Sequence, residues 1–479
     1  MKRKFVWNLL LVVILNLLIK PFYILGIDAE IINRVGASVY GNYFALINFS
    51  FLLNIILDLG ITNYNVKNIA QYHHLVTKHF SGIITLRFLL VILYLFFTLL
   101  IAYFWGYNSY QFKLLFILAI NQSLVAFILY IRSNLAGLHL FVQDSIVSVL
   151  DRVLLIIICS FLLWGGTFST FKIEWFIYAQ TISYLITLFF CTFLLIRQTT
   201  KIVFHWNPSF AIIILKKSLP YAMLILLMTI YYRIDSIMLE RMLNDNSVQA
   251  GVYAQAYRFF EASNMIAYLF AALLLPILSR MLKLKEPIQD VVECAFKILM
   301  VFAIPLSVFC YLYAFEIMDF RYQNFILESS KIFSVLMICF LFVSSTYVYG
   351  TLLTANGNLF YLNFVAAIGV LLNIFLNLIL IPKYYGFGSA IASLITQVLT
   401  GVIQFLLCFF IFKLSIYSTF IKLLFYTLGL CCFGYVCSLY IPFNGIVIIL
   451  YFLFSLTWLF ITKLITPADF TLLMNNKIK

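Results

Sequence analysis

Charged residues are scarce in this chain. Only 10% of its 479 residues are Asp, Glu, Lys or Arg, whereas 65% are hydrophobic and 18% are aromatic. Soluble domains carry about 25% charged and about 45–50% apolar residues, and the mean hydropathy here is +1.07. Such a chain has too little polar surface to cover its own core in water, which excludes soluble enzymes, disordered scaffolds and secreted disulfide modules. Lipid must be the solvent for most of its surface.

Motifs for catalysis and metal binding are also missing. The sequence contains no Gly-x4-Gly-Lys-Ser/Thr loop for ATP phosphates and no Gly-x-Ser-x-Gly elbow for a nucleophilic serine. The nine cysteines lie mostly in apolar stretches, where a free cysteine acts as a small apolar residue. The histidines, which fall in expected cytoplasmic loops without metal-ligand spacing, are His73, His74, His79, His139 and His205. We expect no metal, no cofactor and no enzymatic activity, and transport is the function that a many-span chain with small loops favours.

Long apolar stretches are abundant. A membrane-spanning helix needs roughly 20 apolar residues, and fourteen stretches meet this length without the alternation of a barrel strand. They lie at about 6–27, 39–60, 81–105, 111–131, 145–166, 173–196, 211–239, 250–279, 293–315, 329–353, 359–381, 387–412, 418–440 and 443–464. No loop is long enough for a soluble domain. These features predict an all-α integral membrane protein with about 14 transmembrane helices.

The first apolar stretch needs a separate interpretation, because its basic start, Lys2-Arg3-Lys4, is also typical of a signal peptide. No small-residue cleavage site follows, and the run continues through Lys20-Pro21 to Gly26. We therefore expect a retained span with a kink at Pro21.

The distribution of basic residues predicts the orientation. With the N-terminus in the cytoplasm, the segments expected inside hold 19 Lys and Arg, among them Arg87, and those expected outside hold 7. Cytoplasmic loops carry the excess of basic residues, so both termini are expected inside. The net charge of +14 is spread over many loops, which argues against a nucleic-acid partner.

A weak internal repeat accompanies the span count. Gly41-Asn42-Tyr43 opens the second span, and Gly251-Val252-Tyr253 opens the eighth, 210 residues later. Because six is an even number, two six-helix halves enter the membrane from the same side and form a parallel repeat with a pseudo-two-fold axis along the membrane normal. We expect an N-terminal lobe at 1–205, a C-terminal lobe at 206–413, and two further helices with a tail at 414–479.

A few charged residues fall inside or beside the spans, where a charge is costly and faces a cavity or a partner. The basic ones proposed to line a cationic, substrate-binding cavity are Lys20, Arg34, Arg233 and Arg258. The acidic candidates for ion coupling are Asp58, Asp235 and Glu261. Lys20 is the hardest to explain structurally, because it is deep and has no acidic residue three or four positions away.

Each of the other charges has a structural alternative. Arg258 and Glu261 are three residues apart and could neutralise each other, and Arg233 and Asp235 could serve in inter-helix pairs. Asp58 could lie among lipid headgroups. Asp151-Arg152 is best read as snorkelling toward the cytoplasm.

Several motifs resemble those of Wzx-type polysaccharide flippases. In the first half these are Asn33-Arg34-Val35-Gly36, Tyr40-Gly41-x-Tyr43, Asp58-Leu59-Gly60-Ile61 and Asn68-Ile69-Ala70. In the second half they are Arg233-Ile234-Asp235, Gly251-x-Tyr253, Leu275-Pro276-x3-Arg280, Asn373-Ile374-x2-Asn377, Ile381-Pro382 and Gly386-x-Gly388-Ser389-Ala390. Each motif is loose, and Val35 is a mild departure, but their order across nearly the whole chain is specific.

The resemblance implies the fold of the multidrug/oligosaccharidyl-lipid/polysaccharide (MOP) exporters, which is MATE-like with two six-helix lobes and two C-terminal helices. It also implies a function in the bacterial cytoplasmic membrane: moving an undecaprenyl-pyrophosphate-linked oligosaccharide from the cytoplasmic to the outer leaflet. A polysaccharide polymerase is an implied partner. Arg34 is the first residue to carry over as a ligand of the anionic headgroup, whereas the other three cations rest on the cavity argument.

The absence of an ATP site suggests that an ion gradient, of H⁺ or Na⁺, or the membrane potential resets the two lobes. Rocking of the lobes about a fixed site would then expose the headgroup to each side in turn.

Three other functions remain open. A cation-coupled multidrug exporter of the same superfamily would be expected to have an acidic cavity, and a lipid II flippase would share both the fold and a related substrate. A membrane-embedded glycosyltransferase or polymerase usually needs a sizeable outer loop. The longest outer loop here, about 316–328, is short.

Replacement of Lys20 or Arg34 by Ala should leave folding intact and abolish glycan export, because either variant removes a cation from the proposed cavity. Surface glycan in a deletion strain complemented with each variant measures this. Normal export by both variants would contradict a cationic cavity.

Overall fold

The computed structural model describes residues 14–62, 65, 75–138, 140–166, 170–197, 208–244, 247–414 and 417–465. Throughout these residues the regular structure is helical, without a strand. The chain divides into two compact units, Met1–Ala254 and Gln255–Lys479. The boundary falls inside one helix, α11 (Val248–Lys283), so that the first two turns of this helix belong to the first unit.

The first unit contains a helical lead at 14–22, a π-helix and then a series of α-helices. They are η1 (Tyr23–Asp28), α2 (Ala29–Val35), α3 (Ala37–Leu53), α4 (Ile55–Asp58), α6 (Leu75–Phe104), α7 (Ser109–Gly137), α8 (Phe141–Trp164), α9 (Ile173–Ile196) and α10 (Pro208–Met242). Helix α3 packs against both α7 and α10, and α9 packs against α7 and α8.

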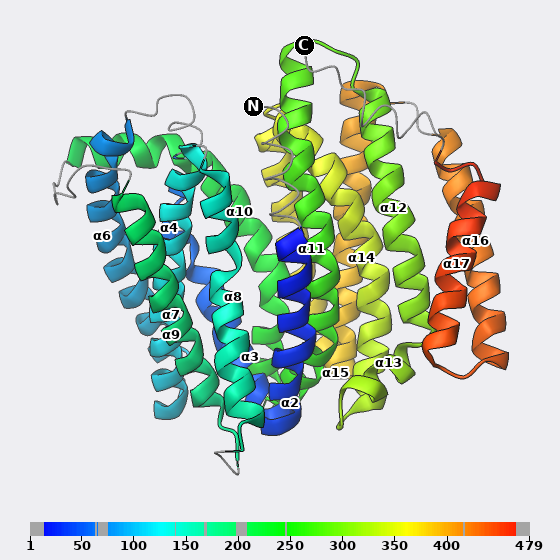
Figure 1. Ribbon diagram of the computed structural model, residues 1–479, viewed down its shortest axis with the longest axis horizontal. Helices are drawn as coiled ribbons and strands as arrows, with labels where there is room; N and C mark the ends of the chain where they lie inside the picture. The colour runs from blue at the N-terminus through cyan, green and yellow to red at the C-terminus, as the bar shows by residue number, and fades with distance from the viewer. Residues whose placement is uncertain are drawn as a thin grey trace. The chain divides into compact units, whose positions relative to one another are not determined.

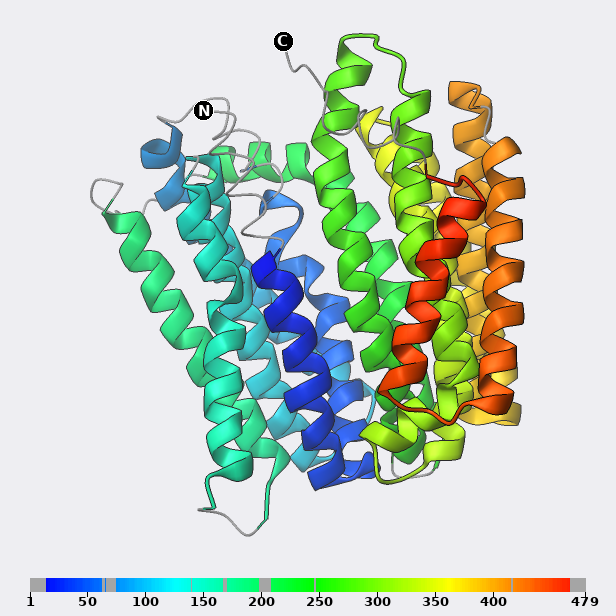
Figure 2. The same ribbon diagram turned by 45° about the vertical axis from the view of Figure 1, so that its right-hand side comes forward.

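The second unit contains the rest of α11 and six further helices. They are α12 (Gln289–Leu312), α13 (Ala314–Arg321), α14 (Ile326–Ala355), α15 (Leu359–Phe412), α16 (Tyr417–Tyr440) and α17 (Gly445–Ile461). Helix α14 packs between α12 and α15. The C-terminal pair, α16 and α17, lies side by side and packs on α12, as both ribbon views show (Figures 1 and 2).

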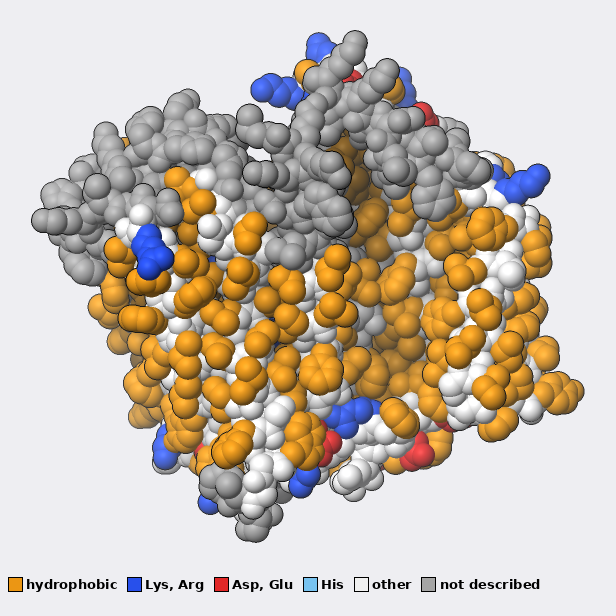
Figure 3. Space-filling model, in the orientation of Figure 1, with side chains coloured by type: hydrophobic (Ala, Val, Ile, Leu, Met, Phe, Trp, Pro, Cys, Tyr) orange, Lys and Arg blue, Asp and Glu red, His pale blue; other side chains and the backbone are white. Residues whose placement is uncertain are grey.

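Eleven of the described helices are long and apolar enough to cross a membrane. One of them, α15, has 54 residues, more than twice the length that one crossing needs, and its backbone breaks at Tyr385, where φ is 53°. The break lies between the predicted spans 359–381 and 387–412. On the face drawn in Figure 3, hydrophobic side chains cover a broad middle band, with charged side chains toward the two ends. The chain is therefore a multi-pass membrane protein, and the number fourteen stays a prediction.

The seventh predicted span, 211–239, differs from the structure at its start. The part of α10 that can cross a membrane is Ala222–Met242. The earlier turns of α10 lie across one end of the first unit in both ribbon views (Figures 1 and 2). This part of α10 includes Lys216, whose side chain is exposed. A lysine so placed suits a membrane surface better than hydrocarbon, which explains why the spanning part begins later than predicted.

The helix at the first predicted span also differs from the prediction, because it continues past residue 27. After Pro21 the backbone forms the π-helix η1 and then α2, which ends at Val35. Proline has no N–H to donate to the preceding turn, and single-turn π-helices often interrupt α-helices at functional sites. Gly36, with φ at 83°, makes the turn into α3. A side chain would be strained at this angle.

The division into units places α10 with the first unit, where it packs on α3. The predicted boundaries at 205/206 and 413/414 separate two lobes that repeat each other in the order of their spans. The division into compact units instead groups residues by their spatial contacts. The predicted lobes therefore stay a prediction.

Candidate functional site

Lys20 lies on the helical lead and is half-buried. The π-helix that follows it, η1, packs on α8. The contact is fixed one turn earlier, where Asn16 Nδ2 donates a hydrogen bond to Ser148 Oγ at 3.1 Å, with both side chains buried. Lys20 is therefore held at a defined position against α8.

The charges nearest to Lys20 come from neighbouring helices. Arg152, Asp151 and Arg132 all act on Lys20 electrostatically. The Arg152 guanidinium lies 4.9 Å from the centroid of the Tyr23 ring, and its Nε is 3.5 Å from Asp151 Oδ2. Asp151 and Arg152 therefore pack against the first span, instead of snorkelling to a surface as expected. They lie ten residues into α8, or about 15 Å along the helix.

The balance of this cluster is positive. Arg132 Nε is 2.7 Å from Asp144 Oδ1, which neutralises one cation. Arg152 and Asp151 form a second pair, which leaves Lys20 as the excess positive charge. Within the part of the chain that the structure describes, no hydrogen bond or ion pair satisfies the Lys20 ammonium group. A cation in this condition can bind an anionic ligand.

Arg34 and Arg233 lie elsewhere in the first unit. Arg34 is at the other end of the first span, fourteen residues or about 20 Å from Lys20. Its side chain is 48% exposed, and its Nε is 3.2 Å from Glu30 Oε1 on the same helix. Arg233 on α10 donates from Nη1 to Asn48 Oδ1 at 3.1 Å and lies over the Phe51 ring. The structure thus does not gather Lys20, Arg34 and Arg233 into one contact cluster.

Arg258 and Glu261 belong to the second unit, on α11. Arg258 Nη1 donates to Glu261 Oε2 at 2.6 Å. The sequence analysis gave this pairing of two residues three positions apart as the structural alternative to a role in transport. Their roles as substrate ligand and ion carrier stay predictions.

Asp58 lies in a network centred on the buried side chain of Arg87. The Arg87 guanidinium on α6 forms a salt bridge with Asp58 and donates to Thr62 Oγ1 at 2.8 Å and to the Ala126 carbonyl at 3.1 Å. It also stacks on the Tyr130 ring, and its side chain is 2% exposed. The count of basic residues placed Arg87 with the inner loops, which is wrong. Its ion-pair partner, Asp58, is 29 residues away in the sequence, so the pair cannot be recognised from the residues near Arg87.

Two other buried carboxylates are bonded to tyrosines. Asp235 on α10 accepts a hydrogen bond from Tyr253 at 2.9 Å, and Asp28 in η1 accepts one from Tyr40 at 2.9 Å. Both carboxylates are fully buried. The sequence analysis missed Asp28, because it placed the end of the first span one residue earlier. The apolar residues Ile31 and Ile32, which follow Asp28, were the sign in the sequence that the helix continues.

A polar network joins α3, α7 and the end of α10. Gln111 Nε2 donates to Asn42 Oδ1 at 3.1 Å and to Glu240 Oε1 at 3.0 Å. Next to it, the Arg241 guanidinium lies 3.6 Å from the centroid of the Tyr107 ring. Burial, with a smaller effect of Glu240, raises the pKa of Tyr107 to about 12. The phenol is therefore neutral at physiological pH.

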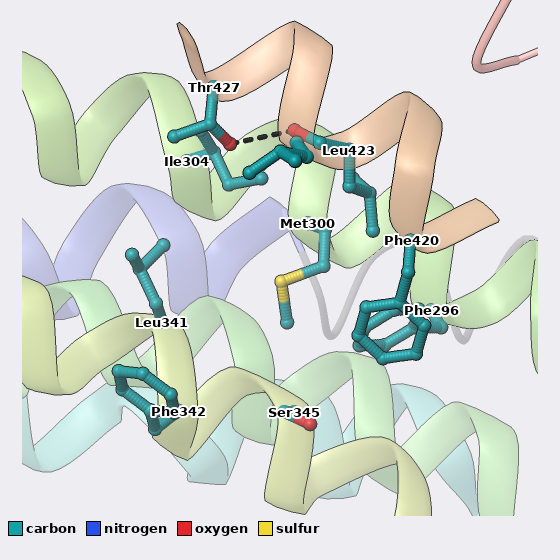
Figure 4. Close-up of a pocket in the computed structure, with 10 residues that line it drawn as sticks. Phe296, Met300, Ile304, Leu341, Phe342, Ser345, Phe420, Leu423 and Thr427 are labelled. Atoms are coloured by element: carbon teal, nitrogen blue, oxygen red, sulfur yellow. Dashed lines mark hydrogen bonds between the residues drawn. The ribbon is translucent and has the colours of Figure 1, made fainter. Parts of the chain in front are cut away.

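The second unit holds an apolar pocket between α12, α14 and α16. Figure 4 shows Met300, Leu341 and Phe420 among the side chains that line its volume of about 270 Å³. The Thr427 hydroxyl is bonded to the Leu423 carbonyl of its own helix. A second pocket of about 520 Å³, lined by the same three helices, shares Leu341. Neither pocket offers a charged group to a headgroup.

The family model for polysaccharide biosynthesis proteins matches residues 5–282, more than half of the chain. This chain belongs to the polysaccharide biosynthesis protein family. A comparison with curated protein sequences returns no match.

Solved structures similar to this family member are transporters. It aligns with a lipid II flippase MurJ in an inward closed conformation, with a TM-score of 0.72, 19% identity, and coverage of 97% of this chain and 99% of the other. An outward-facing multidrug resistance MATE transporter of the MOP superfamily gives 0.61 at 14% identity, covering 85% and 95%. A MOP transporter from Pyrococcus furiosus, described as having a binding pocket of reversed polarity, gives 0.59 at 14%, covering 85% and 94%. The predicted MOP fold is confirmed.

Replacement of Arg87 by Ala should strongly destabilise the first unit. Loss of the buried guanidinium leaves Asp58, which is 25% exposed, without its counter-ion and removes the donor from the Thr62 hydroxyl and the Ala126 carbonyl, at a cost of about 1–3 kcal/mol for each group that stays buried. Thermal unfolding of the purified protein in detergent measures the loss. The matched control is Arg197→Ala, because Arg197 is exposed at the end of α9, where substitution costs roughly 0.5 kcal/mol or less. Equal unfolding temperatures for the two variants would contradict a structural role for Arg87.

Proposed function

We propose that this protein is a flippase that moves a polyprenyl-(pyro)phosphate-linked oligosaccharide from the cytoplasmic to the outer leaflet by alternating access. The observation that carries the proposal is the uncompensated Lys20 in the first span. Its neighbours contribute paired charges, so one net positive charge remains within the helices. A phosphate group is the ligand chemistry that this excess favours.

The family and the fold support the same substrate class. The family is one of polysaccharide biosynthesis proteins. The MurJ structure, which shares the fold, is that of a lipid II flippase, and lipid II is a lipid-linked substrate. A polar glycan cannot cross hydrocarbon unaided, and a protein that supplies charge and water at the headgroup lowers that barrier while the lipid tail stays in the bilayer.

The Lys20 ammonium acts as the headgroup ligand in this proposal, with Arg152 as its neighbour from α8. Because α8 is expected to begin on the cytoplasmic side, a cluster about 15 Å along it would lie near the middle of a hydrocarbon core of roughly 30 Å, on the path of a substrate from the cytoplasmic leaflet. Arg34, on the same span but far from Lys20, would meet the headgroup late, near the outer surface. The two cations would thus act in sequence.

A cation-coupled drug exporter is the main alternative, because MATE transporters share the fold. The positive balance around Lys20 disfavours a cationic drug. A deletion strain distinguishes the two: loss of surface glycan with unchanged drug sensitivity supports the flippase, and the reverse supports the exporter.

Lys20→Met should abolish glycan export, whereas Lys20→Arg should retain most of it, because the required property is a positive charge at this depth. Surface glycan per copy of membrane-inserted protein, in the complemented deletion strain, is the measurement. Lys113→Met, which removes an exposed lysine from α7, is the matched control and should export normally. Full export by Lys20→Met would rule out a headgroup role for Lys20.

For ion coupling we propose Asp28 and Asp235, ahead of Asp58 and Glu261. Asp28 and Asp235 are 0% and 2% exposed, whereas the side chains of Asp58 and Glu261 are 25% and 26% exposed. A fully buried carboxyl group exchanges its proton or cation only when the surrounding helices rearrange, which is the property that coupling requires. Asp28 and Asp235 are each bonded to a tyrosine hydroxyl, a neutral group that can remain bonded when the carboxyl group takes up a proton or a cation. Tyr23 and Cys159 are the other titratable groups that act on or are influenced by Asp28.

Asp28→Asn and Asp235→Asn should fold normally, because an amide oxygen can still accept the tyrosine hydrogen bond, but they should lose gradient-driven transport. Proteoliposomes with an imposed proton or sodium gradient would show this, with the internal pH followed by a dye. Downhill substrate exchange serves as the internal control and should persist. If both variants respond to the gradients as the unmodified protein does, the coupling site lies elsewhere.

A further inference from the structure

The first turns of α10, residues 208–221, lie outside the part of this helix that can cross a membrane, which begins at Ala222. Both ribbon views show these turns lying across one end of the first unit (Figures 1 and 2). Pro220 stands just before the spanning part, and a proline inside a helix bends it, because it has no N–H for the preceding turn. We refer to residues 208–221 as the surface segment.

One side of the surface segment is packed against the first unit. Ile214 is buried and belongs to a hydrophobic cluster with Phe80 of α6 and Leu195 of α9. Ser218 is also buried, and its carbonyl oxygen would lie 2.6 Å from a Cβ atom on Gly60, so the two backbones meet closely there. The segment is therefore held at a defined place, with a defined side turned outward.

The outward side of the surface segment is apolar. Ile212, Ile213 and Leu219 are each more than half exposed. A single exposed aliphatic side chain is common, but several together form a patch that marks an interaction site. Burial of apolar area is favourable in proportion to the area that is removed from water. This side of the segment is therefore expected to have an apolar cover.

A cation stands among these apolar side chains. Lys216 is exposed, and Ile212 precedes it by four residues while Leu219 follows it by three, so the three lie along one face of the helix. A lysine extends its ammonium group beyond the apolar stem that carries it. An apolar face that includes such a cation suits the level between lipid headgroups and acyl chains, where amphipathic helices lie in the plane of the membrane.

The charge of this part of the chain has one sign. It holds four basic residues from 197 to 217, and no Asp or Glu occurs from 175 to 234. This end of α10 is expected on the cytoplasmic side, and the cytoplasmic leaflet carries anionic lipids that attract basic segments at its surface. Charge complementarity therefore favours an anionic lipid surface over a neutral one as the cover of the exposed face.

We propose that the surface segment is a binding site for anionic phospholipids. Ile212, Ile213 and Leu219 insert between the headgroups and the acyl chains, and the Lys216 ammonium group pairs with a lipid phosphate. Because the opposite side of the segment is packed on the helices of the first unit, bound lipid holds this end of the unit at the membrane surface. The inference does not depend on which substrate the protein moves.

The test uses a fluorophore on the surface segment of the full-length protein. The exposed Cys431 and Cys432 are first replaced by Ala, and Ile213→Cys is labelled with an NBD maleimide. The protein is reconstituted in vesicles of phosphatidylglycerol and phosphatidylcholine in equal amounts. Acyl chains that carry a nitroxide, which quenches the fluorophore on close approach, belong to the phosphatidylglycerol in one preparation and to the phosphatidylcholine in the other. The ratio of the two quenching constants measures enrichment of the anionic lipid at the segment.

Phosphatidylglycerol should quench the fluorophore more strongly than phosphatidylcholine. Lys216→Gln should lower the ratio by about fivefold, the factor that one basic residue contributes at an anionic surface. Lys216→Arg retains the charge and should retain the ratio. Lys113→Gln is the matched control, because it removes an exposed lysine from the start of α7 with the same change in net charge, and it should leave the ratio unchanged.

Equal quenching by the two lipids would overturn the proposal, because the segment would then rest in a bilayer without selecting its charge. Quenching by aqueous iodide in place of either lipid would also overturn it, since the face would then lie in water. Quenching by none of the three would mean that protein covers the face, from this chain or a second copy, which is equally incompatible with a lipid site.

Thermal unfolding of every variant is measured in parallel, and Lys216 is exposed, so its replacement is expected to leave the fold intact. The quenching measurements need no glycan. Failure of the flippase proposal, seen as normal surface glycan in a deletion strain, is therefore separate from failure of the lipid site.

Discussion

Hydrocarbon offers a buried charge no water and no counter-ion, and this constraint explains most of what is specific in the structure. Each charged or polar group inside the helices must find its partner within the protein. Arg87 meets the requirement through its two Nη atoms, which bond to a carboxylate, a hydroxyl and a backbone carbonyl, and through an aromatic face beside the guanidinium. Among the described residues its buried Nε has no hydrogen-bond partner. That network joins α4, α6 and α7, so the packing of the first unit depends on it.

The same constraint separates the structural charges from the candidate functional ones. Arg132 with Asp144, and Arg258 with Glu261, form close pairs that leave no net charge. Lys20 is different, because the charges around it are already paired among themselves. A positive charge that the fold maintains at such a depth carries a cost in stability, and binding of an anionic headgroup is the function that would account for it.

The internal repeat has a counterpart in the packing of the helices. Gly41 and Gly251, 210 residues apart, are related in sequence, and they also touch, through the backbones of α3 and α11. The tyrosines that follow them tie each helix to a different neighbour. Because α10 itself packs on α3, these ties hold the contact between the two helices together within the first compact unit.

The sequence alone was sufficient for the membrane class, the helical fold, the positions of most spans and the family. The class, the fold and the spans depend on composition and on runs of about 20 apolar residues, which are local properties, and the family depends on the order of short motifs along the chain. It also indicated that Lys20 is unusual and that Gly41 and Gly251 correspond. Only the tertiary structure decided which charges are compensated, because partners such as Asp58 and Arg87, or Asp235 and Tyr253, lie on different helices. Asp28 escaped notice because the end of a span is set by packing against its neighbours, whereas hydropathy changes little there. The contact between the two glycines could not be inferred either, since equal spacing in a repeat does not say that the equivalent residues meet at the axis.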